Sequence, residues 1–302
     1  MNETKRYKLT VAYDGSAFHG WQRQEPAGLP VLRTGQGVLE NALVRVLRQP
    51  REELGLLGAS RTDAGVHAVG QVCHLNTYSP IPPDRMVRAI NSRLPDDLEV
   101  RSAQVVHDAF DAIRDATDKQ YRYRIFDAPY RPLGLRNLVY VSRRSALDSA
   151  LMNDAAARLV GTHDVEGFAA VAHGRATTVR SIHACCVEEH PLPIGYGEGR
   201  ELHVVISGSG FLYNMVRIIA GTLFEVGRGA MPPSRIDEIL ATQERRLAGP
   251  TLPPTGLCLE WVRYGEQKGV LCEGMDLTPR RQEAKTPRMA KEQTEGEHGG
   301  LC

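Results

Sequence analysis

The chain has 302 residues, 42% of them hydrophobic and 24% charged, which is the composition of an ordinary globular protein with one large or two modest cores. Its 37 basic and 36 acidic residues nearly cancel, so the net charge alone points to no class of partner. The first residues form no apolar leader, and the most apolar stretch, residues 211–226, is too short and too interrupted by charges to span a bilayer. We therefore expect a cytoplasmic protein without a membrane partner.

The first half of the chain predicts a βαββαβ order of elements. Its predicted strands span residues 7–13, 55–58, 67–77 and 98–106, and its helices span about 36–48 and 83–94. The strand over 7–13 alternates cleanly and closes at Asp14-Gly15, a turn dipeptide. This order is typical of a ferredoxin-like unit, in which an antiparallel sheet carries helices on one face.

The second half repeats this order with insertions. Its predicted strands span residues 120–126, 179–187, 201–207 and 257–264, and its helices span about 147–160, 212–226 and 234–242. We therefore predict an α+β fold of two ferredoxin-like βαββαβ units, residues 1–112 and 113–267, with their antiparallel sheets side by side and a catalytic groove between them. The remaining residues, 268–302, lose all periodicity and are expected to be a disordered tail.

Basic residues cluster near the start of the second half. Between Lys119 and Arg144 a single acid, Asp127, faces seven basic residues: Lys119, Arg122, Arg124, Arg131, Arg136, Arg143 and Arg144. Such a stripe can follow a phosphate backbone, although a solvated face is an equally good interpretation. Arginine predominates, and its guanidinium can grip a phosphate in two places, which favours RNA.

A polar loop separates the two middle strands of the first half. Its sequence is Ser60-Arg61-Thr62-Asp63-Ala64-Gly65-Val66-His67. An ordinary turn explains it, because aspartate can bond its own backbone and glycine can adopt a left-handed conformation. The functional interpretation is a loop that holds the Asp63 carboxylate in a cleft, with Arg61 and His67 as polar neighbours.

Arg217 is the unusual residue of the helix predicted over 212–226, which is apolar on nearly every side. A buried guanidinium without an anion would cost several kcal/mol. The side chain therefore either reaches solvent along its apolar stem or faces an anion in a pocket. If that anion is Asp63, the arginine should lower the pKa of the carboxyl group and keep it ionised, as a nucleophile or base requires.

Tyr121 lies within the basic stripe, on a strand whose residues alternate between two sides. By default it is a core residue, but a ring at this place could stack on an unpaired RNA base. Two other sites are not supported. The segment Gly208-Ser209-Gly210 lacks the third glycine of a dinucleotide fingerprint, and the histidines at 163, 173, 183 and 190 lack metal-ligand spacing. We therefore expect neither a metal nor a cofactor.

Several motifs resemble the tRNA pseudouridine synthase A family in order, over residues 6 to about 264. The most specific is Arg61-Thr62-Asp63-Ala64-Gly65-Val66-His67. The others are Tyr13-Asp14-Gly15, Gly20-Trp21-Gln22-Arg23-Gln24, Tyr121-Arg122-Tyr123, Gly161-Thr162-His163-Asp164, Met215-Val216-Arg217 and Gly249-Pro250-Thr251. Two places depart from the family pattern: Arg114 is shifted by one position, and Thr34-Gly35-Gln36 replaces Thr-Val-Gln.

The resemblance implies a cofactor-free homodimeric isomerase that converts uridine to pseudouridine at positions 38–40 of the tRNA anticodon arm. It implies that Asp63 is the catalytic aspartate, that Arg217 pairs with it, and that Tyr121 contacts the substrate. Arg61, His67 and Arg122 are further expected substrate contacts. Asp63 could attack the base or the ribose, or remove a ribose proton. Two rival functions stay open: a non-catalytic RNA-binding protein, and a hydrolase that uses Asp63 and His67.

Overall fold

The computed structural model describes residues 3–25, 28, 30–142, 147–170 and 177–265, which all belong to one compact unit. The predicted tail over 268–302 and two arginines of the basic stripe, Arg143 and Arg144, lie outside the described residues. The fold is α+β, as predicted. Within the described part of the chain, no helix is long and apolar enough to cross a membrane.

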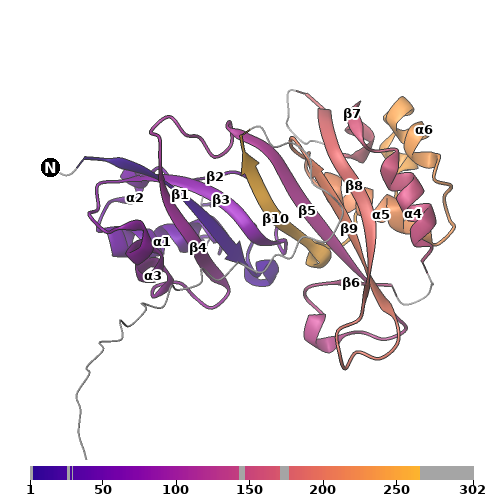
Figure 1. The fold of residues 1–302 in the computed structure, drawn as a ribbon, viewed down its shortest axis with the longest axis horizontal. Coiled ribbons are helices and arrows are strands. Elements are labelled where there is room, and N and C mark those ends of the chain that lie inside the picture. Colours follow the sequence, from indigo (N-terminus) through magenta and orange to yellow (C-terminus); the bar gives the residue numbers. More distant parts are fainter. Residues whose placement is uncertain (1–2, 26–27, 29, 143–146, 171–176, 266–302) are drawn as a thin grey trace, which may run out of the picture. The chain divides into compact units, whose positions relative to one another are not determined.

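Ten strands form one sheet, seen across Figure 1. Eight of them follow the order β4-β1-β3-β10-β5-β9-β8-β7, while β2 pairs with β3 and β6 pairs with β5. Their bounds are β1 Lys5–Tyr13, β2 Leu57–Gly58, β3 His67–Thr77, β4 Leu98–Val106, β5 Ala116–Asp127, β6 Tyr140–Ser142, β7 Gly161–Asp164, β8 Val179–Pro191, β9 Arg200–Gly208 and β10 Leu257–Tyr264.

The described residues form six α-helices, in two groups that Figure 1 shows near opposite ends of the sheet. They are α1 Gly35–Leu47, α2 Arg51–Leu54, α3 Pro83–Asn91, α4 Ser149–Ala157, α5 Met215–Gly227 and α6 Arg235–Thr242. Helix α3 contacts β4, whereas α4 contacts both β8 and α5. Helices α1, α2 and α3 thus lie with the strands of the first half, and α4, α5 and α6 lie with those of the second half.

The two halves share one continuous sheet, which differs from the predicted pair of sheets. Strands β3 and β10 join them in parallel, with Cys258 opposite His67 and Leu259 opposite Ala68. The two backbones lie so close that a Cβ atom on Gly70 would stand 2.1 Å from the carbonyl oxygen of Glu260. Because His67 is also the last residue of the Asp63 loop, this junction fixes the loop against the second half.

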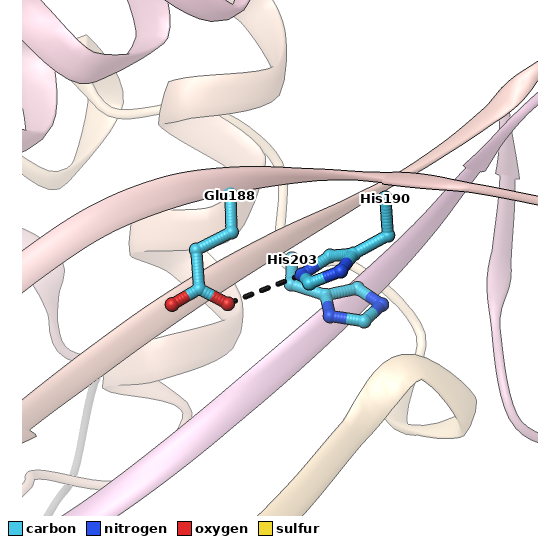
Figure 2. A group of neighbouring side chains, drawn as sticks. All are labelled: Glu188, His190 and His203. Atoms are coloured by element: carbon cyan, nitrogen blue, oxygen red, sulfur yellow. Dashed lines mark hydrogen bonds and ion pairs between the residues drawn. The ribbon is translucent and has the colours of Figure 1, made fainter. Parts of the chain in front are cut away.

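Strand β5 presents different chemistry on the two faces of the sheet. Tyr121, Tyr123 and Ile125 are buried on one side, and the intervening Arg122 and Arg124 point to the other, as strand alternation requires. The second side also carries polar residues from β8 and β9, three of which Figure 2 shows close together. The face with the tyrosines packs into the main core.

Candidate active site

A cavity of about 520 Å³ opens where the Asp63 loop meets β5 and the start of α5. Segments distant in sequence line it, and they include residues 58–63, Ile113, Tyr121 and residues 209–217. Its volume lies in the range of small-molecule pockets. The sequence predicted a groove between the two halves, and the cavity lies at that junction.

Asp63 and Arg217 meet in this cavity. The Nη1 atom of Arg217 lies 3.5 Å from Oδ2 of Asp63, and the two side chains are 15% and 25% exposed respectively. The guanidinium also donates from Nε to the carbonyl oxygen of Leu252 at 2.7 Å and from Nη1 to Oδ1 of Asn214 at 2.6 Å. Arg217 therefore faces an anion and does not reach for solvent, and two further acceptors hold it in place.

Burial decides the electrostatics of Asp63. Desolvation raises the pKa of its carboxyl group above the ordinary value, while the charge of Arg217 and its hydrogen bond act to lower that pKa. Arg217 lowers the pKa of Asp63, as expected, but the loss of water outweighs this one ion pair 3.5 Å long, so the pKa of the carboxyl group is raised overall. Arg217 thus reduces the cost of burying the Asp63 charge but does not abolish that cost.

Tyr121 lines the same cavity and is almost fully buried. Its ring packs edge-on against Phe211, with ring centroids 5.3 Å apart. Burial raises the pKa of Tyr121 to about 12, so the phenol stays protonated at neutral pH. The cavity therefore offers an aromatic wall beside a carboxylate, which suits a planar base.

The other expected contacts divide into two groups. Arg61 is exposed and lines the cavity, as predicted from its place in the loop. His67 does not line it: Nδ1 accepts from the backbone N–H of Gly15 at 3.0 Å, and Nε2 lies 2.8 Å from the carbonyl oxygen of Asn137. Burial lowers the pKa of His67. A neutral imidazole bonded on both sides supports the loop and has no nitrogen left for substrate.

Arg122 points away from the cavity. It pairs with the buried carboxylate of Glu260 at 3.0 Å, and its neighbour Arg124 forms a two-pronged contact with Glu201 at 2.9 Å for each bond. Two members of the basic stripe are therefore neutralised on the far face of the sheet. Lys119 does line the cavity, and its Nζ donates to the carbonyl oxygen of Ala59 at 2.6 Å.

Residues near the N-terminus hold the Asp63 loop in shape. The hydroxyls of Tyr13 and Thr62 are 2.7 Å apart, and the backbone N–H of Trp21 donates to the carbonyl oxygen of Thr62 at 3.1 Å. Gly20 has a φ of +91°, and a Cβ atom there would stand 2.6 Å from that same oxygen. The motifs around Tyr13 and Gly20 thus support the carboxylate without touching the cavity.

We expect Gly20→Ala to destabilise the protein more than Gly229→Ala. Both positions have positive φ, +91° and +76°, so both substitutions carry the energetic cost of an alanine at positive φ. A Cβ at Gly229 meets nothing within 4 Å, whereas the one at Gly20 collides with backbone. The collision should add about 1–3 kcal/mol to the loss of unfolding free energy measured in urea. Equal losses in the two variants would contradict this account of the loop.

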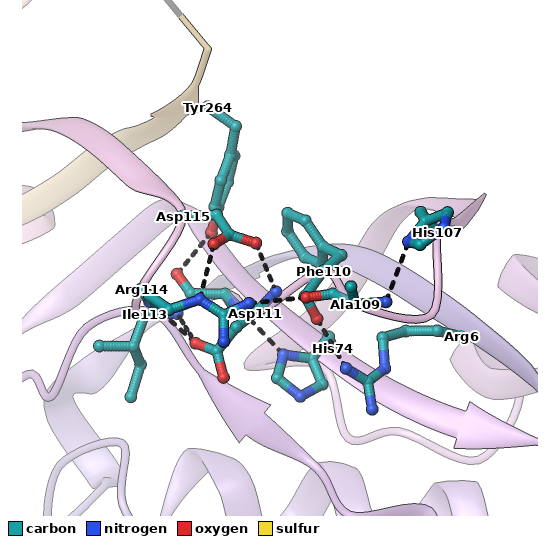
Figure 3. A network of polar contacts seen from close by, with 11 residues as sticks. Arg6, His74, His107, Ala109, Phe110, Asp111, Ile113, Arg114, Asp115 and Tyr264 are labelled. Atoms are coloured by element: carbon teal, nitrogen blue, oxygen red, sulfur yellow. Dashed lines mark hydrogen bonds and ion pairs between the residues drawn. The ribbon is translucent and has the colours of Figure 1, made fainter.

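A second support is the network around residues 107–115, drawn in Figure 3. Oδ1 of Asp111 accepts from the backbone N–H groups of Ile113 and Arg114, both at 2.8 Å. Nδ1 of His74 accepts from Ala112 at 3.0 Å, and Arg114 donates to Asp115 at 3.0 Å. These contacts fix Ile113, which lines the cavity, and they occupy Arg114 in binding its own loop.

Sequence reasoning missed Phe211 and Asn214 as parts of the site. Phe211 forms the aromatic wall with Tyr121, and Asn214, with a φ of +61°, caps the start of α5 and binds Arg217. The predicted helix included residues 212–214, but α5 begins at Met215. The signal was present in Gly208-Ser209-Gly210, a loop sequence that we weighed only against a dinucleotide fingerprint.

The described residues also contain three side chains able to hold a metal ion, Glu188, His190 and His203. They lie on β8 and β9, on the face of the sheet opposite Tyr121, because His203 pairs in register with Arg124. They are therefore separate from the cavity.

Comparison with known proteins identifies close relatives. The sequence matches the family model described as tRNA pseudouridine synthase over residues 9–113 and 155–265. A protein from Ruminiclostridium cellulolyticum named tRNA pseudouridine synthase A is 40% identical over 260 residues, which cover 86% of this chain and 100% of the relative. One of the same name from Shouchella clausii is 42% identical over 261 residues, covering 86% of this chain and 94% of the relative.

Proposed function

The chain belongs to the tRNA pseudouridine synthase A family, and from this we propose that it isomerises uridine at positions 38–40 of the tRNA anticodon arm, with Asp63 as catalytic carboxylate. Pseudouridine synthases are isomerases, so the reaction class is an intramolecular transfer. The observation that carries the proposal is the meeting of Asp63, Arg217 and Tyr121 in one cavity at the junction of the two halves.

The chemistry sets modest requirements. The N1–C1′ bond of uridine breaks, the base turns, and a C5–C1′ bond forms. The proton leaves C5 and N1 gains one, so substrate and product have the same composition. No electron or group enters from outside, and we propose that no cofactor takes part. The target base must first leave the helical stack, at a cost of a few kcal/mol that contacts in the cavity offset.

We propose that Asp63 acts directly on the reacting nucleotide and that Arg217 acts through Asp63. An ionised carboxylate can attack the base or the ribose, or remove a ribose proton, and Arg217 favours the ionised form of the buried carboxyl group. Tyr121 stacks on the base together with Phe211. Because burial raises the pKa of Tyr121 to about 12, its protonated phenol suits stacking and hydrogen bonding better than proton removal.

We infer the other contacts with the nucleotide from which side chains line the cavity. Arg61 and Lys119 line the cavity and are placed to meet phosphate or ribose, whereas His67 and Arg122 receive no contact with the reacting nucleotide. We propose two ferredoxin-like units, residues 1–112 and 113–267. The strand orders β4-β1-β3, with β2 beside β3, and β10-β5-β9-β8 support them. We further propose a homodimer that acts on tRNA in the cytoplasm.

The hydrolase alternative loses its main support. It required His67 beside Asp63 as a second catalytic group, and both ring nitrogens of His67 have partners outside the cavity. A non-catalytic RNA-binding protein has no use for a carboxylate buried beside an aromatic wall, because an acid in the cavity repels phosphate.

The test is tritium release from a tRNA transcript labelled at C5 of uridine. We expect release together with pseudouridine at positions 38–40, and no release when those uridines are replaced by cytidines. Free uracil would show a hydrolase instead, and binding without release would show a non-catalytic RNA-binding protein. Release that persists from the cytidine transcript would contradict the anticodon-arm assignment.

A further inference from the structure

We propose that Glu188, His190 and His203 form a binding site for a divalent transition-metal ion of the zinc class, on the sheet face opposite the cavity. One ligand atom from each of the three lies within 4.8 Å of those of the other two. Figure 2 shows the three side chains turned toward one another from β8 and β9. Imidazole nitrogens and a carboxylate oxygen are a donor set that zinc-class ions prefer.

His203 provides the observation that points to a ligand. Its side chain is 10% exposed, and within the described part of the chain its Nδ1 atom has no hydrogen-bond partner. A buried polar atom without a partner is unfavourable, so native structures seldom leave one. A metal ion bound to Nδ1 would remove that cost.

The other nitrogen of His203 is already arranged for metal binding. Nε2 lies 2.9 Å from Oε2 of Glu201, and Arg124 grips the two oxygens of that carboxylate. The carboxylate therefore accepts and Nε2 carries the hydrogen, which leaves a lone pair on Nδ1 when the ring is neutral. A carboxylate behind a histidine is the usual outer support of a metal ligand.

His190 and Glu188 complete the set and have room to adjust. His190 Nε2 lies 3.2 Å from Oε2 of Glu188, and their side chains are 43% and 26% exposed. Ligands about 2 Å from a tetrahedral metal are roughly 3.3 Å apart. Because no two of the ligand atoms are more than 4.8 Å apart, no separation must close by more than about 1.5 Å. The His190 ring lies beside that of His203, with centroids 4.2 Å apart and the ring planes tilted by 32°. Because its side chain is 43% exposed, His190 can swing to close the separation.

This group could not be recognised from the spacing of residues along the chain, because its members come from two strands. In the β8–β9 ladder Glu188 stands opposite His203, and His190 stands opposite Glu201. A bound ion would therefore link the two strands across the ladder, and its measurable effect should be on thermal stability. Three protein ligands leave a further position on the ion for water.

The test uses the full chain, freed of metal with a chelator and titrated with ZnCl₂ in a calorimeter. His190→Ala removes an exposed ligand and should not perturb the fold. The matched control is His107→Ala, which removes an exposed imidazole outside the group. We expect wild type and the control to bind one equivalent that His190→Ala binds at least about 100-fold more weakly, since loss of an outer support alone costs 10–100-fold.

Melting temperatures give a second measurement on the same proteins. Zinc should raise the melting temperature of wild type and His107→Ala and leave that of His190→Ala unchanged, because an ion that binds only the folded state stabilises it. Magnesium, which prefers oxygen ligands, should shift none of them. The proposal fails if wild type binds no equivalent of zinc, or if His190→Ala binds and responds as wild type does.

Discussion

Asp63→Asn should abolish turnover while leaving tRNA binding within a few-fold of wild type. The substitution keeps the size of the side chain and removes the charge and basicity that the reaction needs. We expect the rate of pseudouridine formation to fall by about 10⁴-fold or more, as happens when an enzyme loses a group that acts on the reacting bond. Affinity should survive, because many contacts to phosphate and ribose carry it.

The fold of this variant should be intact for a structural reason. Arg217 keeps two acceptors without Asp63, the carbonyl oxygen of Leu252 at 2.7 Å and Oδ1 of Asn214 at 2.6 Å. Its guanidinium therefore keeps hydrogen-bond partners but loses its anion, and this loss lowers stability. Removing the buried carboxylate also removes a desolvation penalty, which raises the pKa of Asp63 in the wild type. These two effects oppose each other, so the melting temperature should change little.

The measurement is tritium release from C5-labelled tRNA under single-turnover conditions, with binding measured separately by filter retention. Asp96→Asn is the matched control, because it makes the same chemical change at an exposed position outside the cavity. Substantial release by Asp63→Asn would remove Asp63 from the chemistry. A loss of tRNA binding equal to the loss of rate would make it a binding residue instead.

Much of the fold was predictable because strands and helices are local patterns. The strands over 67–77, 98–106 and 257–264 have the predicted bounds, since each alternates or is continuously apolar between clear turn residues. Short elements were missed, among them α2 with four residues and β6 with three. So few residues are not enough to show a periodic pattern of apolar side chains. The β3–β10 pairing was also missed, since nothing local specifies a contact between residues about 190 positions apart.

Within the site, sequence order was a poor guide to which neighbours share the cavity. Arg122 follows Tyr121 directly, yet strand alternation places it on the opposite face, against Glu260. His67 ends the Asp63 motif, but its ring turns toward Gly15 and Asn137. Arg217 was correctly expected to face an anion, because a charge in an apolar helix has few alternatives. The free-energy cost of burying a charge therefore indicated which residue lies in the site better than closeness along the chain did.

Arg217→Met should shift the pH dependence of catalysis and leave the apolar packing of α5 in place. In the wild type, burial raises the pKa of Asp63 and Arg217 opposes that rise. Without the arginine burial acts unopposed, so the pKa of Asp63 should increase further. A reaction that needs the ionised carboxylate should then slow sharply near neutral pH and recover partly as pH increases. Arg217→Lys should fall between Met and wild type, since it restores a point charge without the fork.

The free energy of unfolding should depend on pH in the direction opposite to that of the catalytic rate. A buried carboxyl group with a raised pKa binds its proton more tightly in the folded state than in the unfolded state. Unfolding free energy is therefore lost as pH rises through the folded pKa and regained as pH falls. Arg217→Met should accordingly lie further below wild type at pH 7 than at pH 5 in urea denaturation. A part of the deficit independent of pH is also expected, because the carbonyl oxygen of Leu252 loses its donor.

The double variant Asp63→Asn with Arg217→Met separates these effects. With no carboxyl group at position 63, the pH-dependent part of the stability deficit should vanish, while the part due to Leu252 should remain. Single-turnover rates of wild type, Arg217→Met and Arg217→Lys over pH 6–9 provide the catalytic profile. A rate and midpoint unchanged in Arg217→Met, or a pH-dependent deficit that persists in the double variant, would show that something other than Arg217 sets the charge of Asp63.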